Sequence, residues 1–354
     1  MFKKVISIVT MLLVVLIVWF SRNELVEAID HIKDMNMWVL ALLIPVQCIM
    51  FLSAGEIYFS YLRAKGKLKG KTMFSMARLG LEINFVNHVI PSGGVSGLGY
   101  MAWRLRRFGV SAGQATLMHI LRYALVAIVT TVFILISTVF LAISGVPLPA
   151  VLFSAAMGLA MLAFVVVAFI VLRKDAHVHG FCKWISRFIN KLVKLVTFGR
   201  IPEIVKQKTL DKYFGDLRRD FVELTKDKKL IKGPIVWAAI YALMDSGTFW
   251  IAFLALGAGV PIFPVIVAQG MASVVGTVVV TPGGAGFYEA AMIWYFVSTG
   301  INPATAIVAT LVTRMVVLAT TIVTGWGFYQ LAISRGEGKR RLALPKEKNG
   351  KSNA

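Results

Sequence analysis

Seven charged residues lie inside long apolar stretches of the sequence, where a bare charge is energetically costly. They are the arginines Arg78, Arg122 and Arg314 and the carboxylates Glu56, Glu82, Asp245 and Glu289. Ionisable side chains in such surroundings are retained where they pair with one another or face a water-filled cavity, and they mark binding sites and ion pathways. We therefore regard these residues as the first candidates for chemistry in this chain.

Two proline–glycine turns interrupt the same apolar stretches, and they are similar to each other. The first reads Pro91-Ser92-Gly93-Gly94 and the second Thr281-Pro282-Gly283-Gly284-Ala285-Gly286. Proline followed by glycine ends a helix, and the helix that begins afterwards has free backbone N–H groups and a positive dipole end. Such an end binds anions, and an arginine adds a bidentate contact to phosphate.

We accordingly predict an anion site formed by both turns and the arginines that follow them. The predicted substrate-binding residues are Arg122, Arg314, Pro91, Ser92, Gly93, Gly94, Pro282, Gly283, Gly284, Gly286 and Glu289.

The remaining polar residues receive different roles. Glu56 and Asp245, with Asn87 and His88 on the approach to the first turn, are predicted to bind a cationic head group or to carry protons. A lone histidine of this kind more often completes a local hydrogen-bond network. Arg78 and Glu82 lie four residues apart on one helix face and are predicted to form a structural ion pair. Because no motif for a nucleotide or a metal is present, we predict no catalytic residue, cofactor or metal.

The composition places these residues in a membrane. Hydrophobic residues make up 58% of the 354 residues, charged residues 16%, and the mean hydropathy is +0.76. These values indicate a polytopic helical membrane protein. The net charge of +21 does not indicate DNA binding, because the basic residues gather in a few loops and in the tail. The positive-inside rule then predicts that both termini are cytoplasmic in the cell membrane.

The order of apolar segments predicts an all-α protein with about six full spans. The expected spans are 5–20, 37–61, 114–143, 151–172, 234–256 and 305–331. Between them, only nine residues separate the first glycine pair from Arg104-Leu105-Arg106-Arg107, and nine helical residues cover roughly 14 Å, about half the hydrocarbon core. We therefore predict that 72–103 and 262–298 are re-entrant helical hairpins.

The two hairpins belong to two halves of similar layout. In each half an acidic residue precedes the turn, at Glu56 and Asp245, and an arginine follows it, at Arg122 and Arg314. The hairpins must enter from opposite faces if the tail is cytoplasmic, which predicts an inverted repeat, a common transporter architecture. We expect one transmembrane domain over 1–333, with repeats at about 37–143 and 234–331, a basic cytoplasmic loop at 173–233 and a basic tail at 334–354.

These motifs resemble a known family. Asn87-His88-Val89-Ile90-Pro91-Ser92-Gly93-Gly94, Arg122 and the stretch from Thr281 to Glu289 are similar to the transmembrane region of lysylphosphatidylglycerol synthetases, a flippase-like region also found alone. The resemblance implies translocation of lysyl-phosphatidylglycerol, which helps to repel cationic antimicrobial peptides. In full-length relatives a cytosolic domain makes this lipid from lysyl-tRNA, and the roughly 20 residues after the last expected span leave no room for it.

We therefore expect lipid translocation, with an anionic or aminoacylated phospholipid or a polyprenyl-phosphate lipid as substrate and membrane phospholipids as partners. One alternative is a non-catalytic membrane partner that scaffolds a lipid-modifying enzyme through 173–233, and a homo-oligomer is also open. Another is a phosphatidylglycerol lysyltransferase, which needs a surface for tRNA. The substrate, the direction and the energy coupling stay open at this point.

Overall fold

The computed structural model describes a helical protein, and the described residues are 35–68, 70, 72–90, 95–173, 179–180, 182–184, 186–187, 190, 222, 227–278 and 286–334. Ten α-helices and one 3₁₀ helix have defined bounds in this part of the chain. They are α3 (Met37–Ala41), α4 (Leu43–Ala64), α5 (Met73–Val89), α6 (Val95–Leu105), η1 (Arg106–Phe108), α7 (Ala112–Ile143), α8 (Leu148–Arg173), α11 (Lys228–Ala255), α12 (Ile262–Val278), α13 (Phe287–Ser298) and α14 (Pro303–Ser334).

Five helical stretches in the described part are long and apolar enough to cross a membrane. They are Met37–Ala64, Gly113–Ile143, Leu148–Ile170, Lys229–Ala255 and Pro303–Ser334. The prediction of an all-α membrane protein is confirmed, and these stretches coincide with five of the six expected spans. The sixth, 5–20, lies outside the described residues, as does most of the basic loop 173–233. The total number of spans therefore stays a prediction.

Local sequence explains where several helices begin. The Thr72 hydroxyl accepts from the Ser75 amide at the start of α5, at 3.2 Å. Ser111 and Gln114 form a capping box at the start of α7, in which each side chain bonds the other residue's backbone N–H group. The Asp227 carboxylate caps α11 by accepting from the Lys229 amide at 3.0 Å. These caps satisfy N–H groups that have no partner within the helix.

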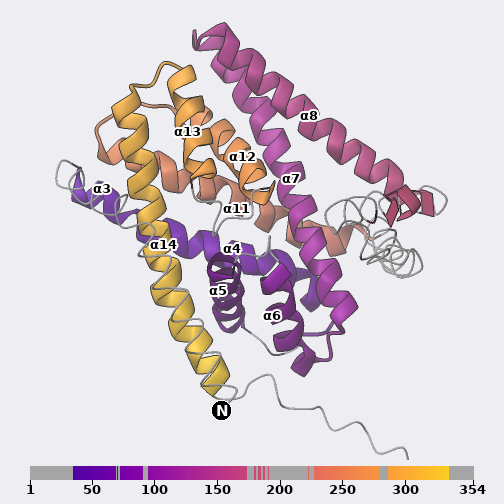
Figure 1. The fold of residues 1–354 in the computed structure, drawn as a ribbon. Coiled ribbons are helices and arrows are strands. Elements are labelled where there is room, and N and C mark those ends of the chain that lie inside the picture. The colour runs from indigo at the N-terminus through magenta and orange to yellow at the C-terminus, as the bar shows by residue number, and fades with distance from the viewer. Residues whose placement is uncertain are drawn as a thin grey trace, which may run out of the picture.

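The helices of the two predicted halves pack across each other. Figure 1 shows α5 and α6 in the lower half of the molecule and α12 and α13 in the upper half, while α7 and α14 run beside them in opposite directions. The central helices α4 and α11 make the most extensive contact of the fold. Each hairpin packs against the long helix of the other half, α5 against α14 and α12 against α7. These contacts connect the two predicted repeats.

The hairpin helices are short compared with their neighbours. Helix α6 has 11 residues and α13 has 12, against 32 in both α7 and α14. At 1.5 Å per residue, α6 and α13 extend about 16–18 Å, roughly half the hydrocarbon core. Their lengths are compatible with the predicted re-entry from opposite faces.

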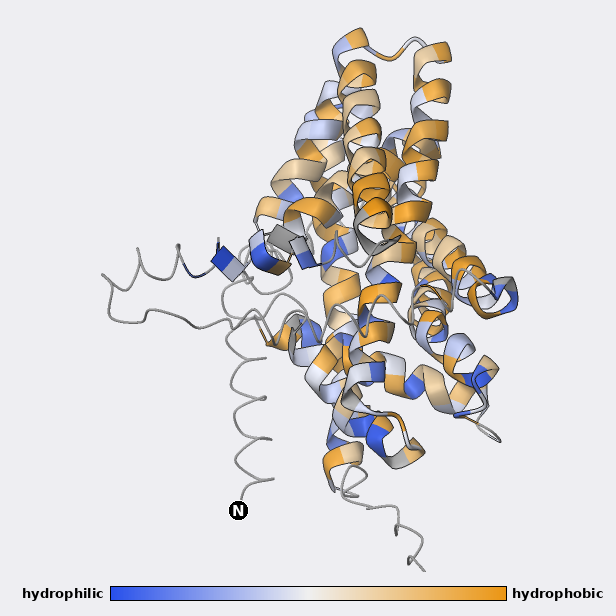
Figure 2. Ribbon diagram, turned by 90° about the vertical axis from the view of Figure 1, so that its right-hand side faces the viewer, coloured by the Kyte–Doolittle hydropathy of each residue, from blue (hydrophilic) through white to orange (hydrophobic). Residues whose placement is uncertain are grey.

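The surface is apolar where the long helices face outward. Hydrophobic residues cover much of these helices in Figure 2, and hydrophilic residues gather in the lower half. Phe164 and Leu152 of α8, for example, are 71% and 60% exposed. Exposed apolar surface of this extent fits contact with lipid, which is consistent with the multi-pass membrane assignment.

Candidate functional site

The structure describes only a small part of the two proline–glycine turns. Pro91, Ser92, Gly93 and Gly94 lie outside the described residues, and so do Pro282, Gly283 and Gly284; the His88 side chain is also outside them. Gly286 is described, and it precedes α13 with φ +85°, a conformation that favours glycine.

Side chains of the protein itself bond one described backbone amide near the start of the helix that follows each turn. The Gly97 amide donates to Asn87 Oδ1 at 2.9 Å, and the Gly286 amide donates to Glu289 Oε2 at 2.7 Å. Asn87 therefore acts here as a bridge between α5 and α6. A phosphate at these helix ends would have to use other amides or displace these side chains.

Glu82 is the centre of a buried ion cluster within the first hairpin. Its carboxylate accepts from Arg78 Nε at 2.9 Å, from Arg104 Nε at 2.8 Å and from the Tyr100 hydroxyl at 2.8 Å. Arg104 is 2% exposed, although its place in the basic cluster Arg104-Leu105-Arg106-Arg107 indicates a position at the membrane edge. The predicted pair of Arg78 and Glu82 is present, and Arg104 completes it.

Two further carboxylates also pair with arginine. Glu56 of α4 is fully buried and forms an ion pair with Arg63, which lies seven residues later in the same helix. Glu289 of α13 accepts from Arg314 Nε of α14 at 2.5 Å, and the same guanidinium lies 4.3 Å from the centre of the Tyr288 ring. Because Glu289 also caps α13, this pair fixes the start of that helix to α14.

Arg122 of α7 is held by aromatic residues instead. Its Nη1 donates to the Tyr58 hydroxyl at 2.9 Å, and its guanidinium lies 5.3–5.9 Å from the ring centres of Tyr58, Tyr123 and Tyr241. Cation–π contacts use the faces of the guanidinium and leave most of its N–H donors available. In the described part of the chain, Arg122 forms no salt bridge with a carboxylate.

Asp245 of α11 is the acidic counterpart of Arg122. Its Oδ2 accepts from Gln269 Nε2 of α12 at 2.6 Å. Among the described residues, no arginine or lysine forms a salt bridge with it. Glu56, Glu82 and Glu289 each have an arginine, so Asp245 differs from all three.

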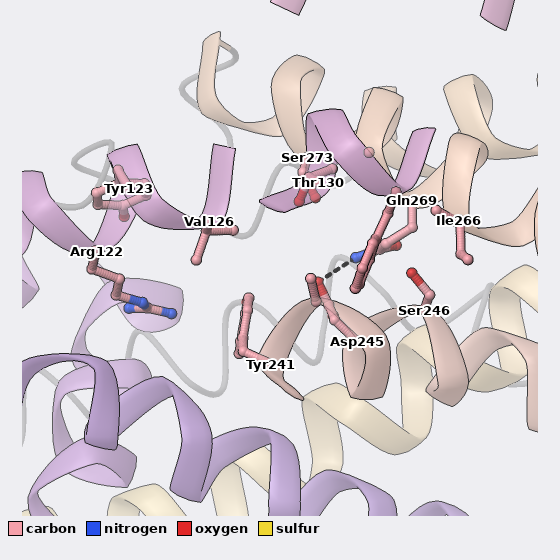
Figure 3. A pocket seen from close by; sticks show the side chains of 13 residues that line it. Arg122, Tyr123, Val126, Thr130, Tyr241, Asp245, Ser246, Ile266, Gln269 and Ser273 are labelled. Atoms are coloured by element: carbon pink, nitrogen blue, oxygen red, sulfur yellow. Dashed lines mark hydrogen bonds between the residues drawn. The ribbon is translucent and has the colours of Figure 1, made fainter. Parts of the chain in front are cut away.

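Arg122 and Asp245 line the same cavity. The cavity has a volume of about 130 Å³ and lies among α7, α11 and α12; this is room for several water molecules. In Figure 3, Tyr241 lies between Arg122 and Asp245, and Ser246, Gln269 and Ser273 add polar groups on the other side. The remaining lining is mostly apolar, with Val126, Phe133 and Ile266 among its residues, and Thr130 adds a hydroxyl group. The cavity can therefore hold a small group that carries charges of both signs.

Some of these residues have no signal in the sequence. Tyr58, Tyr241 and Gln269 are common in helices, and only their placement around Arg122 and Asp245 gives them a role. Tyr241 and Asp245 are four residues apart, which places them on one helix face, and this spacing was the available signal. Arg314 and Glu289 are separated by 25 residues, so their pairing depends on the packing of α13 against α14.

The fold and the cavity define a multi-pass helical membrane protein with a charged cavity among its helices. The chain belongs to the family described as lysylphosphatidylglycerol synthase TM region, which matches residues 5–325. The resemblance noted in the sequence is thereby confirmed, and it connects the chain with lysylphosphatidylglycerol-related lipid handling. Comparisons with curated proteins and with solved structures give no match.

Proposed function

We propose that this protein translocates a phospholipid between the leaflets of the cytoplasmic membrane, with both termini on the cytoplasmic side. The single observation that carries the proposal is that Arg122 and Asp245, the two intramembrane charges without a salt-bridge partner in the described part, line one cavity. A polar head group that crosses a bilayer needs such a water-containing route, because the hydrocarbon core cannot solvate it.

The charges of the cavity suggest which head groups fit. Arg122 has free N–H donors for a phosphate, and the Asp245 carboxylate can accept from an ammonium group. An aminoacylated phospholipid such as lysyl-phosphatidylglycerol carries both groups, and the family membership supports this substrate. The cavity of about 130 Å³ is too small for acyl chains, so these would stay in the bilayer during transfer.

Translocation requires that the cavity opens alternately to each side. The exchange of packing partners between the halves, α5 with α14 and α12 with α7, supports a mechanism in which one half rocks against the other. The cavity lies at this junction, because α7 belongs to the first repeat and α11 and α12 belong to the second.

A leaflet-exchange experiment tests the proposal. The full chain is reconstituted in liposomes of phosphatidylglycerol with lysyl-phosphatidylglycerol labelled on an acyl chain, and the label in the outer leaflet is quenched over time. We expect Arg122→Ala and Asp245→Asn each to slow exchange by about tenfold or more, the typical loss for a charge-assisted contact. Arg106→Ala is the control, because Arg106 is exposed on η1, away from the cavity lining.

The same experiment separates translocation from the alternatives. If the protein only scaffolds a lipid-modifying enzyme, the wild type would exchange no lipid in this assay. Arg122→Ala and Asp245→Asn would then leave the measured exchange unchanged. A lysyltransferase would produce lysyl lipid from phosphatidylglycerol when charged lysyl-tRNA is added. We expect exchange without synthesis, and synthesis by the purified chain would contradict this assignment.

A further inference from the structure

Gln269 lies between the cavity and the second hairpin, and it is bonded at both ends of its amide. Its Nε2 donates to Asp245 Oδ2 at 2.6 Å, and its Oε1 accepts from the Tyr288 hydroxyl at 2.5 Å. Gln269 is 5% exposed and Tyr288 8% exposed. The three side chains come from α11, α12 and α13, so one hydrogen-bonded chain connects three helices.

The chain of hydrogen bonds has one direction. The amide turns its NH₂ group toward Asp245 and its oxygen toward Tyr288, and this orientation suits an ionised carboxylate, which only accepts hydrogen bonds. The Tyr288 hydroxyl then donates to that oxygen. Both donors therefore point toward Asp245, and aligned hydrogen bonds polarise and strengthen one another. This polarity favours the charged form of the carboxyl group over the protonated form.

The Tyr288 end of this series of hydrogen bonds is held in place by packing. The Tyr288 ring packs against the Arg314 guanidinium at 4.3 Å and near Phe249, with ring centres 6.3 Å apart. Arg314 pairs with Glu289, which caps α13 through the Gly286 amide. The hydroxyl that ends the chain is therefore held by the packing of α13 and α14, and it does not depend on the cavity being filled.

We propose that Gln269 and Tyr288 are positioning residues that hold Asp245 as an ionised carboxylate facing the cavity, ready to receive a cationic group. The proposal rests on the proposed function for the identity of that group. The charged and titratable side chains that act on Asp245 from the surrounding helices are Arg122 of α7, Tyr241 of α11, Tyr288 of α13 and Arg314 of α14. None of these pairs with it directly in the described residues, so the amide of Gln269 is its direct partner.

The test measures the protonation of Asp245 without relying on transport. Dicyclohexylcarbodiimide modifies protonated carboxyl groups in apolar surroundings, and the modified peptide is quantified by mass spectrometry. Tyr288→Phe removes the terminal hydroxyl and keeps the ring on Arg314. We expect the initial rate of modification at Asp245, at one pH, to rise about three- to tenfold in Tyr288→Phe and at least as much in Gln269→Leu, the usual worth of one hydrogen bond.

A matched control exists on the same helix. Tyr295 is a buried tyrosine two turns further along α13, and its hydroxyl bonds Ser154 Oγ of α8 at 2.5 Å. Tyr295→Phe removes an equivalent hydroxyl that has no connection to Asp245, so it should leave the modification rate of Asp245 unchanged. The peptide with the arginine-paired Glu82 serves as an internal reference in every sample.

Transport provides the second readout. In the leaflet-exchange assay, Tyr288→Phe should slow exchange of lysyl-phosphatidylglycerol about three- to tenfold in the wild-type background and have no further effect in Asp245→Asn. Unchanged modification of Asp245 in both Tyr288→Phe and Gln269→Leu would overturn the proposal. Increased modification in a protein that exchanges no lipid would instead support the positioning role and refute the proposed function.

Discussion

The two hairpins occupy corresponding positions in the two halves but use their polar residues differently. In the α5–α6 hairpin, the Glu82 carboxylate accepts from Arg78, Arg104 and Tyr100, and these contacts hold α5 and α6 together. In the α12–α13 hairpin, Gln269 and Tyr288 extend toward Asp245 and the cavity. The comparison teaches that two segments with similar sequence motifs can use their polar residues differently: Glu82 bonds only within its hairpin in the contacts described above, whereas Gln269 and Tyr288 reach a residue that lines the cavity.

The glycine residues that pack against the two hairpins also differ in what they contact. A Cβ on Gly80 of α5 would lie 3.2 Å from the Gly55 Cα of α4, so these two backbones touch. A Cβ on Gly325 of α14 would lie 2.5 Å from the Phe85 Cβ of α5. At Gly270 of α12, the nearest atom would be the Cδ1 methyl of Ile134, the end of a flexible side chain. Helix α5 is thus confined by backbone on two sides, while α12 is packed by side chains.

The largest effect on stability is expected at the anchoring hairpin. Glu82→Ala removes the carboxylate that the buried Arg104 and the partly exposed Arg78 share. Removing one partner of a buried ion cluster costs about 3–5 kcal/mol. The purified variant should therefore unfold in detergent at a clearly lower temperature or fail to accumulate. A melting temperature equal to that of the wild type would show that the cluster is not an anchor.

A pair of glycine substitutions gives the next largest effect. Gly325→Ala forces a methyl group into the Phe85 Cβ, which cannot move without the helix backbone, and overpacking of this kind costs about 1–3 kcal/mol. Gly270→Ala meets the Ile134 side chain, which can change rotamer, so we expect a smaller loss. Thermal unfolding of both variants in the same detergent measures the difference. Equal losses would remove the distinction between the two hairpins.

A smaller effect is expected at the start of α13. Gly286→Ala places a side chain at φ +85°, a backbone conformation that costs about 1–3 kcal/mol in residues other than glycine. Among the described residues, no atom lies within 4 Å of a Cβ at this position, so backbone strain is the main cost, and we expect the lower end of that range. Thermal unfolding measures the loss, and Gly99→Ala in α6, where a Cβ would likewise meet no described atom within 4 Å, is the matched control.

The smallest effect on stability is expected at the cavity itself. Asp245→Asn removes a half-buried charge that has no salt-bridge partner in the described part of the chain, and the amide oxygen can still accept from Gln269. Stability should change by less than about 1 kcal/mol, while lipid exchange falls as proposed above. A loss of stability similar to that of Glu82→Ala would mean that Asp245 anchors the fold.

The sequence predicts the architecture well because charge and hydropathy fix it locally. Five of the expected spans appear as long apolar helices, and the family assignment from the motifs is confirmed. The proline–glycine turns are the most prominent motifs of the sequence, yet they lie largely outside the described residues. Their contact with phosphate therefore stays a prediction. Arg122 and Asp245 were identified because a charge within an apolar segment is visible without any structure.

The pairing of these charges could not be predicted, because it depends on contacts between distant segments. Arg314 and Arg122 have similar local sequence, but among the described residues Arg314 alone of the two pairs with a carboxylate, at Glu289 of the neighbouring helix. Arg104 lies near the end of an apolar segment and reads as a loop residue, although packing of α6 on α5 buries it against Glu82. The difference between a paired and an unpaired arginine is therefore tertiary, and it decides which residues form the site.

Helix α14 contacts both hairpins at different points along its length. Arg314 connects it to Glu289 of α13, and the Phe328 carbonyl oxygen accepts from Arg78 of α5 at 3.5 Å. These points are 14 residues apart, about 21 Å of continuous helix. Helix α14 therefore joins α13 to α5 through one continuous helix, so a displacement of α14 along its axis would change its contacts with both hairpins together.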